Sequence, residues 1–191
     1  NSLTNEKYNQ LIYKIDWNRL SSNPNAIDLI RERIEYEKCL TNEELDELQN
    51  KINWRYLSSN PNAIELLKEN QDKINWKNLS LNPNAIELLK ENKDNIDWYW
   101  LSRNRNAIEL LKANQDKINW TKLSRNPNAI ELLKANQDKI DWEVLSANPN
   151  AIDLLKERIE YEKSLTNEEL YQLQNKINRY QLLSNPSIFE D

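Results

Sequence analysis

The chain has 191 residues, a formal net charge of −5 and an apolar content of 38%. This apolar content is below the roughly 45–50% of compact globular domains, and no apolar run approaches the roughly 20 residues of a membrane span. The chain contains no Gly and no His, and its one cysteine, Cys39, cannot form a disulfide within the chain. The missing glycine excludes phosphate-binding loops of the dinucleotide and nucleotide types. The cysteine usage favours a reducing compartment, so we expect a cytoplasmic protein without a membrane segment.

Tryptophan recurs every 22 residues through the middle of the chain, in copies of the motif I-[ND]-W-x-x-L-S-x-N-P-N-A-I-x-L-L. The five copies are marked by Trp54, Trp76, Trp98, Trp120 and Trp142. A strict period of this length is typical of a stack of small supersecondary units, none of which can bury its apolar face alone. We therefore predict an all-α fold, an α-solenoid of 22-residue two-helix repeats.

Two intervals are longer, because 37 residues separate Trp17 from Trp54 and 37 separate Trp142 from Arg179. Each contains the same 15-residue insertion, and the two copies lie 125 residues apart, so a larger repeat encloses the small one. These 37-residue long repeats are predicted to have three helices, and the chain is expected to be a segment of a longer array. The predicted single solenoid at 1–191 consists of a partial N-terminal repeat at 1–16, a long repeat at 17–53, short repeats at 54–75, 76–97, 98–119 and 120–141, a long repeat at 142–178 and a truncated repeat at 179–191.

The second helix of each repeat is expected to open at Asn-Pro, with Asn as the N-cap and Pro at the first helical position. In the repeat at 54–75 this predicts a helix over residues 60–69, with Ala63, Ile64 and Leu67 facing inward. An asparagine follows each apolar run, where we expect it to take the left-handed conformation of a C-terminal cap in place of glycine. These asparagines are Asn70, Asn92, Asn114 and Asn136.

The first helix of each repeat is shorter and is expected to be capped by the Asn or Asp that precedes the Trp. The spacing W-x-x-L places Trp and Leu on one face, so the recurring indole rings are expected to pack in the core. The third helix of the long repeats is opened by the capping boxes Thr41…Glu44 and Thr166…Glu169. Its predicted apolar stripe is Leu45, Leu48 and Ile52 in one copy and Leu170, Leu173 and Ile177 in the other.

The run L-S-x-N-P-N-A-I-x-L-L followed by D-K-I-[ND]-W, with a closing S-N-P-S-I-F-E from Ser184, resembles the short repeats found in many copies in proteins of giant DNA viruses of the mimivirus kind. The resemblance covers nearly the whole chain. It implies a helical repeat protein without an assigned activity, in the host cytoplasm or the virion. Two positions depart from the motif: Arg105 replaces its Pro, which is expected to weaken one helix start, and Arg179 replaces its Trp, which suggests a modified or terminal repeat.

Catalytic groups are scarce in this sequence. Without His, the Cys39 thiol and the hydroxyl groups lack the usual base. Cys39 stands where the other long repeat has Ser164, so we expect a small buried or half-buried side chain. Neither paired Cys nor a calcium-binding loop motif is present. The recurring Asp72, Asp94, Asp116 and Asp138 fit turns or caps, and an active site is normally built once. We predict that the chain is not an enzyme and binds no metal or cofactor.

A comparison of the copies within this chain separates constant from variable positions. The residues one, two and five after the Trp position change in every repeat, and we call this set the variable face. Six of its members are basic and one is acidic, which predicts a positive strip on an acidic body. The members are Asn18, Arg19, Ser22; Arg55, Tyr56, Ser59; Lys77, Asn78, Leu81; Tyr99, Trp100, Arg103; Thr121, Lys122, Arg125; and Glu143, Val144, Ala147.

The variable face contains Tyr99, Trp100 and Arg103, which are residue types that dominate interface hot spots. A large aromatic side chain beside cations favours an acidic or aromatic segment of a partner protein or peptide. The first hypothesis is therefore a non-catalytic protein-interaction scaffold. In the alternative, Trp100 packs on a neighbouring repeat, and the cations only keep the surface hydrated without binding a partner. The residues expected to bind the partner are Tyr99, Trp100, Arg103, Arg105, Lys122, Arg125, Arg55, Tyr56 and Lys77.

Two further functions remain open. An open array with matching ends can stack head to tail, which would make the chain a structural protein that self-assembles into filaments. Helical repeat proteins also bind RNA, reading one base per repeat with two or three side chains. The acidic net charge of −5 argues against nucleic acid, because phosphate contacts supply most of such affinity.

Overall fold

The computed structural model describes residues 14–48 and 50–189. Within these residues all regular structure is helical, and no β-strand is present. Short helices that begin at Trp alternate with helices that begin at Ile, so each short repeat contains two α-helices, as predicted. The chain divides into two compact units, Asn1–Asn95 and Ile96–Asp191. The all-α part of the fold prediction is therefore confirmed.

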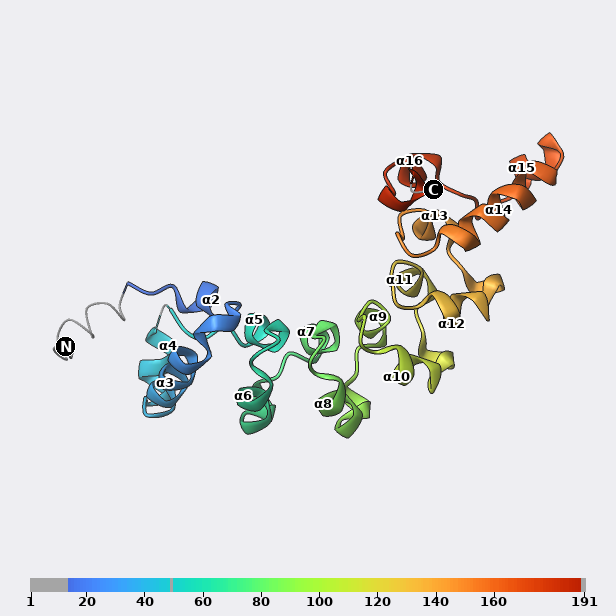
Figure 1. Cartoon of the computed structure of the whole chain (residues 1–191). Helices are drawn as coiled ribbons and strands as arrows, with labels where there is room; N and C mark the ends of the chain where they lie inside the picture. Colours follow the sequence, from blue (N-terminus) through green and yellow to red (C-terminus); the bar gives the residue numbers. More distant parts are fainter. Residues whose placement is uncertain (1–13, 49, 190–191) are drawn as a thin grey trace. The chain divides into compact units, whose positions relative to one another are not determined.

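The first compact unit contains two rows of helices (Figure 1). The helices that begin at Trp form one row, in which α5 and α7 pack against each other, and the helices that begin at Ile form the other. With η denoting a 3-10 helix, the elements are α2 (Trp17–Leu20), η1 (Pro24–Ala26), α3 (Ile27–Lys38), α4 (Asn42–Glu47), α5 (Trp54–Ser59), α6 (Ile64–Glu69), η2 (Gln71–Lys73), α7 (Trp76–Leu81), α8 (Ile86–Glu91) and η3 (Lys93–Asn95).

The second compact unit repeats this arrangement and ends with a second copy of the long repeat. Within it α11 packs against α13, again two helices that begin at Trp. Its elements are α9 (Trp98–Leu101), α10 (Ile108–Lys112), η4 (Gln115–Lys117), α11 (Trp120–Ser124), α12 (Ile130–Lys134), η5 (Gln137–Lys139), α13 (Trp142–Leu145), α14 (Ile152–Ser164), α15 (Asn167–Gln172), α16 (Arg179–Leu183) and η6 (Pro186–Phe189).

The caps of the first helices are as predicted. The Asn53 side chain accepts a hydrogen bond of 3.0 Å from the backbone N–H of Tyr56 at the start of α5. Such a bond satisfies one of the N–H groups that a helix start leaves without a partner. Asp16, Asn75, Asp97, Asn119, Asp141 and Asn178 cap their helices in the same way.

The second helices begin later than predicted. Asn60 accepts hydrogen bonds from the N–H of Asn62 at its side chain (3.1 Å) and of Ala63 at its backbone (3.2 Å), which closes a turn. The helix α6 begins only at Ile64, so the prediction of a helix from residue 60 is wrong. In the first long repeat the same segment forms the 3-10 helix η1. Because the Pro position lies in a turn, its replacement by Arg105 costs no helix start: Asn104 still accepts hydrogen bonds from the N–H of Asn106 at its side chain (3.0 Å) and of Ala107 at its backbone (3.2 Å).

The asparagines that follow these helices act differently from the prediction. No described residue has a positive φ, so the expected left-handed caps are absent from residues 14–48 and 50–189. Asn70 has φ −135° instead, and its Nδ2 donates a hydrogen bond of 2.8 Å to the backbone oxygen of Leu66. The side-chain amide thus satisfies a carbonyl at the helix end, and no glycine-like conformation is needed. Asn92, Asn114 and Asn136 make the equivalent bonds.

The core is formed by leucines and alanines more than by indole rings. Leu57, Ala63 and Leu67 are buried, as is Leu66, which the predicted inward face did not include, whereas Ile64 is only half-buried. Among the motif tryptophans, only those of the long repeats are buried. The buried rings are Trp17 and Trp142, and the half-buried rings are Trp54, Trp76, Trp98 and Trp120.

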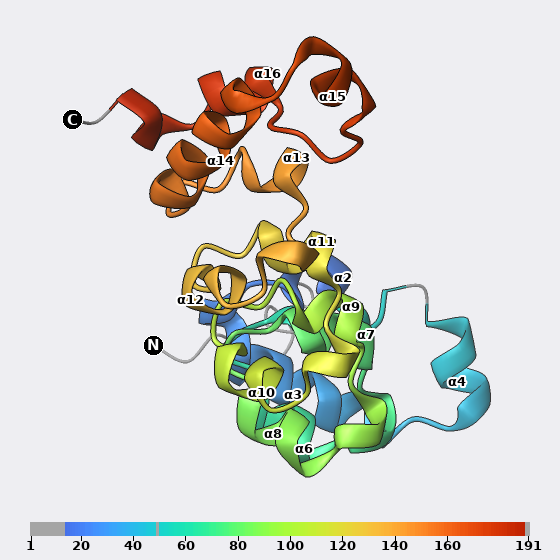
Figure 2. The ribbon, with the colours of Figure 1, turned by 90° about the vertical axis from the view of Figure 1, so that its right-hand side faces the viewer.

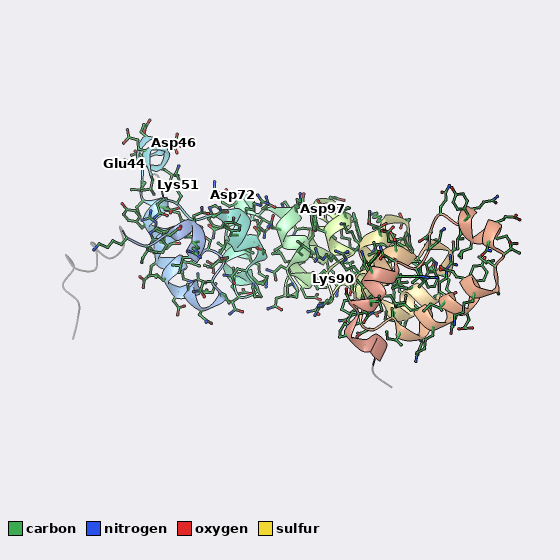
Figure 3. All side chains as sticks on the ribbon, turned by 90° about the horizontal axis from the view of Figure 1, so that it is seen from above. Glu44, Asp46, Lys51, Asp72, Lys90 and Asp97 are labelled. Carbon is green, nitrogen blue, oxygen red and sulfur yellow. The ribbon has the colours of Figure 1, made fainter. Side chains whose placement is uncertain are left out.

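The insertion of each long repeat begins with the predicted capping box and a short helix. In α4 the Thr41 side chain accepts from the Glu44 N–H, and the Glu44 carboxylate accepts from the Thr41 N–H. The helix is shorter than the predicted apolar stripe, because Leu48 is already extended and the buried Ile52 lies beyond it. α4 stands away from the other helices of its compact unit (Figure 2), and it carries Glu44 and Asp46 (Figure 3).

Candidate functional site

The constant asparagine of the N-P-N motif connects neighbouring repeats. Asn82 Nδ2 donates to the backbone oxygens of Ser58 (3.1 Å) and Asn60 (2.9 Å) in the preceding repeat. Asn126 does the same with Ser102 (3.3 Å) and Asn104 (3.0 Å). These amides are buried, where an unpaired carbonyl would be costly. The constant asparagines therefore hold the stack together and do not belong to a surface site.

The constant serine makes a second connection. Ser58 Oγ donates to the backbone oxygen of Trp54 (2.7 Å) and accepts from the N–H of Asn75 in the next repeat (2.9 Å). Ser102 is bonded in the same way to Trp98 (2.7 Å) and Asn119 (2.9 Å). Both hydroxyl groups are buried, and each connects its own helix to the next repeat.

The variable face lies at the surface throughout the six repeats that carry it. Every residue one position after the Trp position is exposed, and those at positions two and five are exposed or half-buried. None of these side chains is buried. The chain therefore varies where side chains meet the solvent and stays constant where they pack or bond between repeats.

Tyr99, Trp100 and Lys122 form a compact cluster in the second compact unit. The two rings lie edge to face with centroids 5.1 Å apart and planes inclined at 83°. The Lys122 ammonium, from the next repeat, lies 4.6 Å from the Tyr99 centroid and 5.9 Å from that of Trp100. Tyr99 remains 43% exposed, and Trp100 is half-buried. A cation over aromatic faces is attractive by about 0.5–1 kcal/mol at exposed sites, so the contact favours this arrangement of the cluster.

Three further cations of the predicted site belong to the same compact unit. Arg103, Arg105 and Arg125 are exposed and form no ion pair with any residue in 14–48 or 50–189. Residues 96–127 contain six Lys or Arg and three Asp or Glu, so this segment is positive in a chain of net charge −5. The cations are therefore free to attract an acidic ligand.

The remaining predicted site residues lie in the first compact unit. Arg55 and Lys77 are exposed, and Tyr56 is 44% exposed. They share the variable face with Tyr99 in sequence, but the candidate site is confined to the cluster and the cations of the second compact unit.

The motif comparison missed a polar network in the long repeats. Arg33 is buried, stacks on Trp17 (5.1 Å) and Tyr36 (4.9 Å), and forms an ion pair of 2.9 Å with Glu37. Glu37 also accepts from the N–H of Ile52 (3.0 Å), beyond the insertion. Both long repeats contain this network. It joins the segment after the insertion to α3 in the first copy and to α14 in the second. The residues of the second copy are Arg158, Trp142, Tyr161, Glu162 and Ile177. The Arg-x-x-x-Glu spacing was its only sequence signal.

Two other predicted features are located by the structure. Cys39 is exposed, which corrects the expectation of a buried or half-buried side chain: it caps the end of α3, where the chain turns toward the insertion. Asp72 is also exposed, in η2 (Figure 3), in agreement with a turn role.

In the part of the chain that the structure describes, no three Asp, Glu or Cys side chains gather into a metal-binding group, and no helix is long and apolar enough to cross a membrane.

The described residues thus define an all-α protein built from repeated short helices, with most constant leucines, serines and alanines buried and the variable side chains at the surface. Comparisons with protein-family models, with curated proteins and with solved structures find no match to this chain.

Proposed function

We propose that the chain is an α-solenoid that acts as a non-catalytic protein-interaction scaffold. Its variable face binds an acidic segment of a partner protein or peptide around Tyr99, Trp100 and Lys122, with Arg103 and Arg125 at the edges. In this proposal the solenoid has the repeat boundaries expected from the sequence, and Arg105 adds positive charge beside the cluster.

One observation carries this proposal: in the repeats that begin at Trp54 to Trp142 the constant Leu, Ser, first Asn and Ala of the motif are buried, whereas the variable side chains are all exposed or half-buried. Interior bonds such as those of Asn126 explain why the frame stays constant, but they do not explain an exposed tyrosine beside a half-buried tryptophan. Large aromatic groups and arginines of this kind are typical of binding hot spots.

The charge around the cluster favours an acidic partner. Arg103, Arg105 and Arg125 lack ion pairs within the described residues, and Lys122 is already positioned over two rings. An acidic segment would gain charge-assisted hydrogen bonds from the guanidinium groups. An aromatic or apolar side chain on that segment would pack on the exposed Tyr99 ring.

The test is a titration of the full chain with fluorescent acidic peptides that contain one aromatic residue, followed by anisotropy. We expect saturable binding that weakens with salt, and about fivefold or greater weakening by Arg103→Glu or Arg125→Glu, because reversed charges repel the ligand. Lys156→Glu is the matched control, since Lys156 is exposed and lies outside the variable face. Equal effects of all three reversals would contradict a local site.

A second variant separates binding from folding. Tyr99→Ala, Trp100→Ala and Arg103→Ala together should abolish binding while helicity by circular dichroism and the melting temperature change little. Loss of the fold would show that these side chains are structural. Tighter, salt-sensitive binding of single-stranded RNA than of peptide would favour the nucleic-acid alternative, and concentration-dependent growth in light scattering would favour filament assembly.

A further inference from the structure

The short helix in the insertion of the second long repeat presents an aromatic ring to solvent. Tyr171, in α15, is 88% exposed. Its counterpart in α4 is Asp46, whose side chain is 89% exposed although further repeats follow it in the same compact unit. The insertion itself therefore places this position at the surface in both copies. A large aromatic ring at such a position keeps its apolar area available for contact with another surface.

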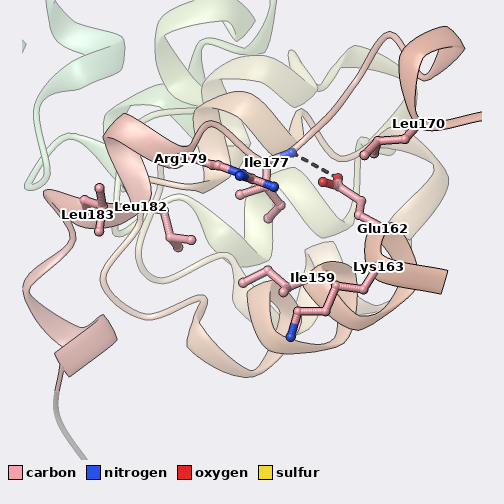
Figure 4. Close-up of a pocket in the computed structure, with 8 residues that line it drawn as sticks. All are labelled: Ile159, Glu162, Lys163, Leu170, Ile177, Arg179, Leu182 and Leu183. Carbon is pink, nitrogen blue, oxygen red and sulfur yellow. Dashed lines mark hydrogen bonds between the residues drawn. The ribbon is translucent and has the colours of Figure 1, made fainter. Parts of the chain in front are cut away.

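The base of the insertion determines which side of α15 faces the repeat. The Glu162 carboxylate accepts a hydrogen bond of 3.0 Å from the N–H of Ile177 (Figure 4), which joins α14 to the segment after α15. Leu170 is half-buried and lines the same cavity as Ile177 (Figure 4). Tyr171 follows Leu170 and lies about 100° further round the helix. Its ring is therefore directed to solvent while its neighbour is directed to the repeat.

The helix α15 also carries carboxylates beside the ring. Glu168 is exposed and lies three residues before Tyr171, on the same face of the helix. Glu168 forms no ion pair within residues 14–48 and 50–189, whereas the neighbouring Glu169 is engaged in the capping box. α15 therefore offers one carboxylate without an ion pair and one aromatic ring. These are the two kinds of group that the cluster around Tyr99 is proposed to bind.

The helix α15 does not meet that cluster within one molecule, although both belong to the second compact unit. α9 and α11 carry Tyr99 and Lys122, and α15 stands apart from both helices in two perpendicular views (Figure 1 and Figure 2). A contact between α15 and the cluster therefore requires two copies of the chain.

We infer that α15 of one copy docks on the variable face of a second copy. This inference rests on the proposed function and names its partner. Tyr171 packs against the exposed ring of Tyr99, and the Glu168 carboxylate accepts charge-assisted hydrogen bonds from Arg103 or Arg125. Those two guanidinium groups are exposed and have no ion pair in the part of the chain that the structure describes.

The test is sedimentation velocity of the full chain, which has a mass of 22.8 kDa, at rising concentration. We expect the unsubstituted chain to self-associate, and Tyr171→Asp to weaken the association at least about fivefold, because aromatic side chains dominate such contacts. The fold should tolerate this change, since α4 has Asp46 at the same exposed position, and circular dichroism checks it. Tyr171→Phe should preserve the association.

Tyr180→Asp is the matched control for Tyr171→Asp. Tyr180 is 86% exposed and belongs to α16, and its replacement adds the same charge at a different surface. Association should therefore be unchanged in Tyr180→Asp. Equal weakening by the two substitutions would overturn the inference, because the effect would then come from net charge and not from the ring of α15.

Mixing two variants identifies both halves of the contact. Arg103→Glu should also weaken self-association at least about fivefold, since the reversed charge repels Glu168. Tyr171→Asp keeps an intact cluster and Arg103→Glu keeps an intact α15, so an equimolar mixture should associate more strongly than either variant alone. The inference is overturned if the mixture behaves like the separate variants, or if both variants associate as the unsubstituted chain does.

Failure of this inference is distinguishable from failure of the proposed function. Saturable binding of the acidic peptides by a chain that stays monomeric would overturn this inference alone. If the peptides also fail to bind, the variable face is not a binding site and both proposals fail. An acidic peptide that binds the cluster should compete with α15 and shift the sedimenting species toward the single chain; association that the bound peptide leaves unchanged would contradict a shared site.

Discussion

Arg33 donates a hydrogen bond of 2.9 Å from its Nη2 to the backbone oxygen of Asn50, which lies beyond α4. The other copy repeats this relationship between Arg158 and Asn175 at 2.8 Å. The bond joins the helix before the insertion to the segment after it. Since Arg33 also pairs with Glu37, one guanidinium group holds the base of each insertion closed while the short helix stands away from it.

We expect Arg33→Ala to destabilise the protein by about 3–5 kcal/mol, because the Glu37 carboxylate, whose side chain is only 11% exposed, loses its ion-pair partner. Arg31→Ala is the control: its ion pair with Glu69 is exposed on both sides, so its loss should cost about 0–1 kcal/mol. Urea unfolding followed by circular dichroism measures both. Similar losses for the two variants would contradict a structural role of the buried pair.

The asparagine connections between repeats lead to a second prediction. Asn126→Ala should cost about 1–3 kcal/mol, because two buried carbonyl groups lose their donor. Asn128→Ala removes only an exposed bond of 3.0 Å to Arg105 and should cost less than about 1 kcal/mol. Hydrogen exchange should show faster opening of the repeats at 98–119 and 120–141 in Asn126→Ala. Unchanged exchange there would mean that the amide does not couple the repeats.

The capping boxes make a prediction that depends on pH. The N–H and hydroxyl of Thr166 each donate a 2.8 Å hydrogen bond to the Glu169 carboxylate, and they hold its pKa below the ordinary value. A lowered folded-state pKa contributes stability above the ordinary pKa, and this contribution is lost as pH falls through the lowered value. The order of α15 should therefore decrease in acid. Thr166→Ala removes the hydroxyl donor and keeps the backbone N–H, so carbon NMR titration should show the Glu169 pKa returning only part of the way toward its ordinary value; an unchanged pKa would refute the contribution of the hydroxyl.

Local hydrogen bonds could be predicted from this sequence, and long-range ones could not. The caps at Asn53 and Thr41 join residues three apart, so the motif alone specifies them. Asn60 is different, because its amide bonds to Ser21 and Asn23, which are 39 and 37 residues away. The sequence shows that Asn60 is a constant position and suggests a helix cap. Its bonds to the preceding repeat depend on how the repeats pack, which the sequence alone does not show.

The variable face was predicted from differences between copies, and its exposure agrees with that prediction. The contact of Lys122 with the two aromatic rings was not predicted, because the sequence cannot show that Lys122 lies over Tyr99 and Trp100 of the preceding repeat. The half-buried state of Leu182, whose counterpart Leu57 in the first long repeat is buried, was missed for a similar reason. The residues are those of a buried core, and only the comparison of two copies in space reveals the exposure.

The tryptophans give the last prediction, because one motif position has two environments. Trp142 is buried under Arg158, whereas Trp120 is half-buried with the Lys139 ammonium 4.8 Å from its ring centroid. Trp142→Ala should cost about 3–5 kcal/mol as a core truncation. Trp120→Ala should cost roughly 1–3 kcal/mol, because only part of the ring surface and one cation–π contact are lost.

Urea unfolding of both variants measures the difference, and Lys139→Met isolates the contribution of the cation over Trp120. Acrylamide quenching of fluorescence offers an independent reading: the emission removed by Trp142→Ala should come from the poorly quenched fraction, and that removed by Trp120→Ala from the accessible fraction. Equal losses of stability, with equal quenching, would show that the indole rings of the short repeats are buried in the core, as the motif predicts. Unequal losses would mean that the repeats are held together mainly by their leucines and asparagines, with the indole rings as a partly solvated outer layer.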